Sequence, residues 1–215
     1  MIIHKDVEQN SEEWYKMRLG IPTSSMFSKL VTTKGEPSKS MKDYAMTLAG
    51  EAYANAPMEG WAGNQWSDRG HALEDEAREF YEMLYDCSVE QVSFVTDDKK
   101  TWGSSPDGLI DDGKGMLEIK CLKGETVIKK TDMYYRSFTD KKPLGQFPTD
   151  YYAQVQGQMF ITEREYCDLL IYHPDLPPLV VRALPDKVFL KGLIEQKTAV
   201  LAERDRLVKL LREKA

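Results

Sequence analysis

The chain has 215 residues, of which 41% are hydrophobic and 30% charged, and it carries a net charge of −6. This composition is ordinary for a soluble globular protein, and no apolar run approaches the roughly 18 residues that a membrane span needs. The acidic balance argues against a protein that coats nucleic acid, but it allows an enzyme with a locally basic channel, because salt screens charges beyond about 10 Å.

The N-terminal part of the chain is predicted to be helical. Asn10 and Glu13 resemble a capping box that opens a helix reaching Arg18. A Thr-Ser-Ser run then offers caps for a short second helix at 25–31. Apolar residues at helical spacing indicate two longer helices, over 41–56 and 67–85.

Strands and further helices make up the rest of the chain. Period-two and apolar runs predict strands at 89–95, 104–111, 115–122, 167–173 and 179–184. Helices are predicted at 149–161 and at about 186–213. The order of helices, strands, helix, strands and helix predicts an α/β fold with a central mixed sheet flanked by helices. We expect one domain over residues 1–215.

Cysteine usage and the N-terminus bear on the compartment. Cys87, Cys121 and Cys167 are scattered and form no CxxC pair, so the sequence predicts neither a disulfide framework nor a zinc site. The first residues become acidic quickly and lack the apolar core of a secretion signal. A reducing, cytoplasmic setting without membrane contact is therefore expected.

The segment SSPDGLIDDGKGMLEIKCL joins two strand-like runs through a turn, DDGKG, of the kind found in hairpins. A loop of two or three residues places Asp107 opposite Ile119 or Lys120. Because side chains alternate along a strand, Glu118 and Lys120 share one face, and their apolar neighbours point to the core. The two acids and the lysine are thus predicted to converge.

Two carboxylates whose oxygens face one point suit a hard dication such as Mg²⁺. A neighbouring lysine can orient or deprotonate an attacking water and neutralise negative charge as it develops. These groups suit phosphodiester hydrolysis. The alternative is a Glu–Lys pair on a solvated sheet face, which is common and contributes little. The hairpin and the alternation favour the functional interpretation.

Asp107, Glu118 and Lys120 resemble the signature of the PD-(D/E)xK nuclease superfamily. More narrowly, the chain resembles the phage lambda exonuclease (YqaJ-type) family of recombination nucleases. The motifs that carry this resemblance follow one another between residues 14 and 160: WYKMRLGIPTSS, RGHALEDEAREFYE, GSSPDGLI with LEIKC, and YYAQVQGQMF.

The resemblance implies a restriction-endonuclease-like core and a processive 5′-to-3′ exonuclease acting on linear double-stranded DNA. It implies two Mg²⁺ ions per site, with Mn²⁺ as a substitute, and release of 5′-mononucleotides that leaves a 3′ overhang. It also implies a homotrimeric ring around DNA ends and a single-strand annealing protein as partner. A phage or prophage gene in a bacterial host would encode such a protein.

The family pattern assigns metal binding to Asp107, Glu118, the Ile119 carbonyl and Glu74, and water activation to Lys120. Without the resemblance, Glu74 would be read as one acid of a solvated helix face. Gln156 and then Gln154 are assigned to the attacking water or scissile phosphate. Gln158 is expected on a solvated face, because residues two apart on a helix do not point the same way.

A 5′-phosphate pocket is assigned to Arg18 and Ser25, with Ser105 as a further contact. A guanidinium can donate two parallel hydrogen bonds to a phosphate, and the first turn of a helix presents free N–H groups. The alternatives are that Ser25 only caps its helix, that Arg18 is a surface residue and that Ser105 stabilises its turn.

Two rival functions remain open. The first is another nuclease of the superfamily, of the restriction-endonuclease or CRISPR-adaptation type; three scattered cysteines argue against the iron–sulfur members of the latter. The second is a non-catalytic protein that binds DNA ends, against which the intact signature residues argue. Digestion of circular DNA distinguishes an endonuclease of the superfamily from an exonuclease, because an enzyme that requires a DNA end leaves a circle uncut.

Overall fold

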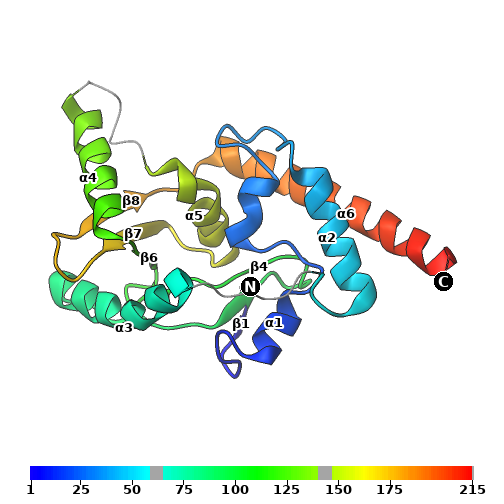
Figure 1. Cartoon of the computed structure of the whole chain (residues 1–215), viewed down its shortest axis with the longest axis horizontal. Coiled ribbons are helices and arrows are strands. Elements are labelled where there is room, and N and C mark those ends of the chain that lie inside the picture. Colours follow the sequence, from blue (N-terminus) through cyan, green and yellow to red (C-terminus); the bar gives the residue numbers. More distant parts are fainter. Residues whose placement is uncertain (59–64, 140–146, 215) are drawn as a thin grey trace.

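The computed structural model describes residues 1–58, 65–139 and 147–214. A five-stranded and a three-stranded sheet are surrounded by helices (Figure 1). Helix α6 (Lys187–Lys214) extends away from the sheets beside α2 (Met41–Ala54) and carries the C-terminal end. In the part of the chain that the structure describes, no helix is both long and apolar enough to cross a bilayer.

The five-stranded sheet is mixed and has the order β2-β5-β6-β7-β8. Its strands are, in that order, Val89–Glu90, Gly108–Ile110, Gly115–Cys121, Tyr166–Tyr172 and Leu179–Ala183. Only β6 and β7 run parallel. A parallel pair needs a long crossover, which contains α4 (Gly124–Thr139) and α5 (Thr149–Ile161). The predicted mixed α/β fold is confirmed.

Helices cover both faces of this sheet. Helix α3 (Gln65–Tyr85) packs Tyr81 against the face that carries Ile119 and Leu170. Helices α4 and α5 lie over the opposite face (Figure 1), where Val127 meets Leu169. Glu118 alternates with Ile119 and therefore faces α5, where only 1% of it is exposed. The expectation that only the apolar residues of β6 face a core is wrong, because both faces are buried.

The three-stranded sheet, β1-β3-β4, is antiparallel and consists of Ile2–His4, Phe94–Thr96 and Gly103–Ser104. The continuous strand predicted at 104–111 is wrong: the chain leaves this sheet at Ser104 and enters the larger one at Gly108. Pro106 lies between them, has no N–H for a strand ladder and restricts the residue before it. Asp107 therefore occupies the passage between two sheets.

Two local predictions near the N-terminus need correction. Ser11, not Asn10, caps α1 (Glu12–Arg18): its hydroxyl accepts a 3.2 Å hydrogen bond from Trp14 N, while Asn10 is left-handed with φ of 65°. The next helix, η1 (Ser24–Lys29), is a 3-10 helix. Helix α4 was not predicted, although its apolar and charged residues lie on separate sides of the helix. The predicted helix at 149–161 is confirmed.

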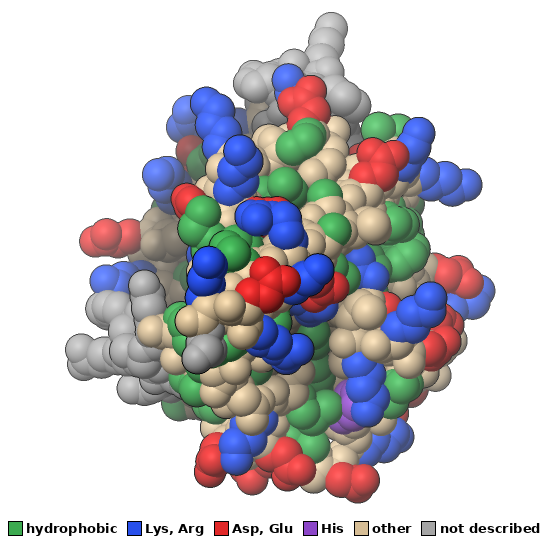
Figure 2. All heavy atoms as spheres, turned by 90° about the vertical axis from the view of Figure 1, so that its right-hand side faces the viewer, with side chains coloured by type: hydrophobic (Ala, Val, Ile, Leu, Met, Phe, Trp, Pro, Cys, Tyr) green, Lys and Arg blue, Asp and Glu red, His purple; other side chains and the backbone are tan. Residues whose placement is uncertain are grey.

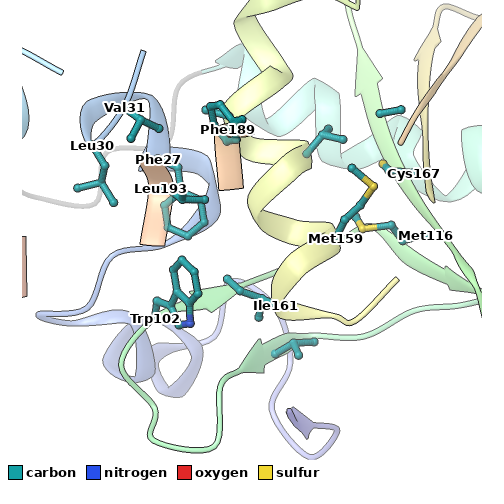
Figure 3. Packing of buried hydrophobic residues seen from close by; sticks show 14 of the residues in the cluster. Phe27, Leu30, Val31, Trp102, Met116, Met159, Ile161, Cys167, Phe189 and Leu193 are labelled. Atoms are coloured by element: carbon teal, nitrogen blue, oxygen red, sulfur yellow. The ribbon is translucent and has the colours of Figure 1, made fainter. Parts of the chain in front are cut away.

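The main hydrophobic core joins α5 to η1 and to the smaller sheet (Figure 3). Trp102 is 3% exposed, and its ring centre lies 5.6 Å from that of Phe27 and 5.5 Å from that of Phe160. Met159 of α5 packs on Met116 of β6 in the same core (Figure 3). Helix α5 is thereby fixed between η1 and the central sheet.

Gly157→Ala tests how closely α5 approaches η1. We expect the free energy of unfolding to fall by about 1–3 kcal/mol, although Ala normally favours a helix by about 1 kcal/mol over Gly. A Cβ at this position would lie 2.2 Å from Cδ2 of the fully buried Phe27. Urea denaturation provides the measurement. The control is Gly124→Ala, whose Cβ meets its nearest heavy atom at 3.5 Å; equal stability of the two variants would contradict the tight contact.

Candidate active site

The hairpin of β5 and β6 brings Asp107 beside Glu118. Gly108 pairs with Leu117, so Asp107 is aligned with Glu118 rather than with the predicted Ile119 or Lys120. The connection 111–114 is longer than the predicted loop. Asp112 Oδ1 closes it by accepting hydrogen bonds of 2.7 Å from the N–H groups of residues 114 and 115, and Gly113 adopts a φ of 73°. The longer turn shifts the register by one residue from the Ile119 alternative and by two from the Lys120 alternative, and it aligns the acids more directly.

Asp107 is anchored to the backbone of β6. Its Oδ2 accepts a 2.5 Å hydrogen bond from Ile119 N. The N–H and C=O of one residue in a strand point to the same side, so the Ile119 carbonyl also faces the edge on which Asp107 lies. The structure thus brings this predicted carbonyl and carboxylate to one side of β6.

Glu118 is held by donors on both carboxylate oxygens. Lys120 Nζ and Gln154 Nε2 each donate to Oε1 at 2.5 Å. Gln158 Nε2 donates to Oε2 at 2.7 Å. The charge of this buried acid is therefore compensated by one ammonium group and two amides.

Asp107 and Lys120 respond to this environment in different ways. Burial, followed by the nearby Glu118 charge, raises the pKa of Asp107 well above its ordinary value. Burial alone would lower the pKa of Lys120, but the charges of Glu118 and Asp107 outweigh it and raise the pKa. Lys120 is accordingly an ammonium donor at neutral pH, while Asp107 lacks full compensation of its negative charge.

The three glutamines of α5 have different places. Gln154 and Gln158, four residues apart, face Glu118. Gln156 points the other way: its amide donates to Leu184 O at 2.8 Å and accepts from Asp186 N at 2.8 Å. The structure does not bring Gln156 to the acids. The expectation that Gln158 lies on a solvated face is wrong, since it is fully buried.

A cleft of about 370 Å³ lies over these groups and includes side chains from α1, η1, α3, β6 and α5. Its lining comprises Gln9, Asn10, Trp14, Tyr15, Arg18, Ser24, Ser25, Glu74, Ser105, Asp107, Glu118, Lys120 and Gln154. Glu74 belongs to α3, which covers the other sheet face, and it also lines the cleft. All predicted site side chains except Gln156 line this cleft.

Arg18 forms a separate cationic centre in the same cleft. Its guanidinium lies 4.0 Å from the ring centre of Trp14, and it donates to Ser105 Oγ and Thr23 Oγ1 at 3.4 Å. Burial lowers the pKa of Arg18 to about 10, which leaves it charged at neutral pH. Within the described residues no carboxylate forms an ion pair with Arg18. A partly buried cation that forms no ion pair with a carboxylate is suited to binding an anion.

Ser25 is exposed at the start of η1, and Thr23, not Ser25, is the N-cap residue. The alternative role of Ser25 as a helix cap is therefore not realised. Ser105 accepts 3.0 Å and 3.4 Å hydrogen bonds from Trp14 Nε1 and Arg18. Trp14 was not among the predicted site residues; its place four residues before Arg18 on a helix was the available signal.

A family model for the YqaJ-like viral recombinase domain matches residues 13–165. The chain belongs to this family. A search of curated proteins found no match. The matched segment contains every side chain of the cleft from Trp14 onward, whereas α6 lies beyond it.

Solved structures agree with this YqaJ-like assignment. An alkaline exonuclease from Laribacter hongkongensis is 28% identical, with a TM-score of 0.77 and coverage of 95% of this chain and 97% of that one. The same exonuclease in complex with dAMP gives a TM-score of 0.78 at the same identity and coverage. A phage related exonuclease from Haemophilus somnus 129PT is 13% identical, covers 89% of this chain and 96% of that one with a TM-score of 0.67, and shows the fold alone. Family and fold together support a nuclease of phage-type recombination.

The donor chemistry of the YqaJ-like site is compatible with Mg²⁺. Asp107 and Glu118 supply carboxylate oxygens, and the unrelieved charge beside Asp107 would be offset by a cation. Across residues 1–58, 65–139 and 147–214, no three His, Cys, Asp or Glu side chains form a group that could enclose a metal. Glu74 therefore lines the cleft without closing such a set. A site with two carboxylates is nevertheless sufficient for Mg²⁺, which usually keeps several of its waters.

Asp107→Asn tests the repulsion between the two acids. In EDTA at neutral pH we expect the variant to be more stable than the wild type by about 0.5–2 kcal/mol, because a site built for function is rarely optimal for stability. Because the pKa of Asp107 is raised in the folded state, its ionisation destabilises that state at pH values above the ordinary pKa of an aspartate. The stability advantage of the variant should therefore shrink as the pH falls towards that ordinary pKa. Thermal unfolding across pH measures it. A variant less stable at every pH would contradict the repulsion.

Proposed function

We propose that this chain is a Mg²⁺-dependent 5′-to-3′ exonuclease on linear double-stranded DNA that releases 5′-mononucleotides. The observation that carries the proposal is the presence, in one cleft, of the pair Asp107 and Glu118 with Lys120 and of Arg18, which forms no ion pair with a carboxylate of the described residues. The first group is suited to hydrolysing a phosphodiester, and the second to binding the phosphate at a strand end. The family and the related alkaline exonuclease support the same reaction.

Asp107, Glu118 and the Ile119 carbonyl would hold Mg²⁺, with Glu74 as the acid nearest a second ion and Mn²⁺ as a substitute. The bound ion supplies Lewis-acid polarisation of the phosphate and lowers the pKa of a bound water. The remaining chemistry belongs to the chain itself. Lys120, held as an ammonium by Glu118, donates to the attacking water or to the developing negative charge.

Gln154 has a similar supporting role. It donates to the same Glu118 oxygen as Lys120, so it lies at the edge of the reacting region. Its amide orients the carboxylate and the water beside it. Gln156, which the resemblance favours, is bonded to Leu184 and Asp186 instead and has no part in this proposal.

Arg18, Ser25 and Ser105 would receive the 5′-phosphate. The planar guanidinium, fixed by stacking on Trp14, offers donors in a fork that matches phosphate. Occupation of this pocket by a terminal phosphate would place the adjacent phosphodiester near the acids and would give the 5′ polarity. Degradation from this end leaves a 3′ single strand, the substrate of a strand-annealing protein, which is the partner that we propose.

A homotrimeric ring around DNA and processive digestion complete the proposal, and family membership supports them. The face in Figure 2, which carries the end of α6, mixes acidic and basic side chains. Ion pairs such as Arg206–Glu203 and Lys209–Glu213 occur there. DNA binding is accordingly proposed at the cleft and along residues 120–139 rather than at this face. In that segment basic residues outnumber acidic ones: Lys120, Lys123, Lys129, Lys130 and Arg136 against Glu125 and Asp132.

Digestion of linear and circular duplexes tests the reaction. With Mg²⁺ we expect mononucleotides from the linear duplex only, and none in EDTA. Lys120→Ala should lower kcat by about 10²–10³-fold, the usual cost of removing one donor to developing charge, while DNA binding is largely retained. Acid-soluble nucleotide release and gel shifts provide the measurements. Cleavage of the circle would favour an endonuclease, and DNA-end binding without any release would favour the non-catalytic alternative.

Arg18→Ala tests the strand-end pocket. Wild-type enzyme should digest a duplex with 5′-phosphates faster than one with 5′-hydroxyls, and the variant should lose this preference, with a fall of roughly 10- to 100-fold on the phosphorylated duplex. Initial rates on the two duplexes give the ratio. Arg206→Ala, which removes an exposed arginine on α6, is the charge control and should keep the preference. Release of nucleotides from 3′ ends would contradict the assignment of the 5′-phosphate pocket, although the protein would still be a nuclease.

A further inference from the structure

Gln158 occupies an unusual position beneath the acids. It is fully buried on α5, and its Nε2 donates both to Glu118 Oε2 at 2.7 Å and to Ser105 O at 3.4 Å. The first contact is with the β6 carboxylate and the second with the passage between the two sheets. One amide nitrogen therefore links the two chain segments that carry the acids.

The other end of this amide has no partner. Gln158 Oε1 is buried and accepts no hydrogen bond within the described residues. An unsatisfied buried acceptor destabilises a folded protein. An unbranched apolar side chain such as Met would fill the same space without that acceptor, but it would make no contact with Glu118. The orphan oxygen accompanies the contact with the acid, which points to a role of Gln158 in the site.

The contact with Glu118 identifies that role. Lys120 and Gln154 both bind Oε1, and only Gln158 binds Oε2 in the described structure. Without it the carboxylate would be free to turn about its terminal bond and to change which lone pairs face the cleft. The 3.4 Å contact with Ser105 O also ties this carboxylate to the residue whose hydroxyl accepts from Arg18.

We propose that Gln158 is a positioning residue that fixes the orientation of Glu118 for cation binding and sets its spacing from the phosphate pocket. The inference rests on the proposed function and deepens it. Gln158 lies below the cleft and is not among its lining residues, so it acts through Glu118 and Ser105 rather than on DNA.

Gln158→Met separates positioning from packing. We expect little net change of Tm in EDTA, because the substitution removes the buried orphan oxygen and also the donor to Glu118 Oε2. We also expect kcat to fall about 10- to 100-fold, as for loss of a group that orients a metal ligand, with little change in KM. A second readout needs no catalysis: the Mg²⁺ concentration that gives half of the metal-induced rise in Tm should increase by about 10- to 100-fold.

Tyr152→Phe is the matched control on the same helix. It removes the 2.7 Å hydrogen bond from the Tyr152 hydroxyl to Asp186, outside the cleft, and should change neither kcat nor the Mg²⁺ requirement. If Gln158→Met keeps the wild-type kcat and Mg²⁺ requirement, or if it loses activity only in proportion to a lower Tm, the positioning role is refuted while the exonuclease stands. If the wild type releases no nucleotide with Mg²⁺, the proposed function fails and the inference fails with it.

Discussion

The burial of a glutamate carboxylate inside a three-layer fold is the constraint on which the site depends. Glu118 lies on a central strand whose two faces are both covered, so its desolvation must be offset locally. Lys120 and two amides of α5 provide that compensation. Asp107 lies beside it, and among the described residues its carboxylate accepts a hydrogen bond from the Ile119 N–H alone; burial and the Glu118 charge raise its pKa. The fold therefore stabilises one acid and leaves its neighbour with excess negative charge, which is the electrostatic condition for recruiting a cation.

Helix α5 serves both the core and the site, which couples packing to chemistry. Its Gly157 allows close contact with Phe27, while the residues on either side of this contact, Gln154 and Gln158, reach Glu118. The same contact holds η1, and with it Ser25, against the cleft. A displacement of α5 would thus alter the donors to Glu118 and the proposed phosphate pocket together. Rigid elements of this kind hold reacting groups more accurately than loops do, because their side chains are fixed by packing on several sides.

Much of this arrangement could be predicted from the sequence, and the errors have identifiable physical causes. The alternation in LEIKC placed Glu118 and Lys120 on one face, because a strand permits no other pattern. The predicted partner of Asp107 was wrong by one or two residues, because a side-chain cap from Asp112 closes the turn and periodicity does not reveal such a cap. Residues 104–111 contain the ends of two strands, because Ser104 pairs in the smaller sheet and Gly108 in the larger one. The local sequence does not show this difference in pairing. For α5, a helical wheel separates Gln156 from the other two glutamines but does not say which set meets the sheet; only packing against Met116 and Phe27 decides this.

Ser105 connects the two functional halves of the cleft and explains why they are expected to act as one unit. Its hydroxyl accepts hydrogen bonds from Trp14 and Arg18, and its carbonyl accepts from Gln158, which holds Glu118. Two residues further on, Asp107 bonds to β6. The path from guanidinium to carboxylate thus runs through one short segment with no flexible loop between. In the proposed reaction, such a short link fixes the distance between the bound terminal phosphate and the scissile bond. The length of the released product would then follow from the backbone between Ser105 and Asp107, because a change in that spacing would move the acids to a different phosphodiester.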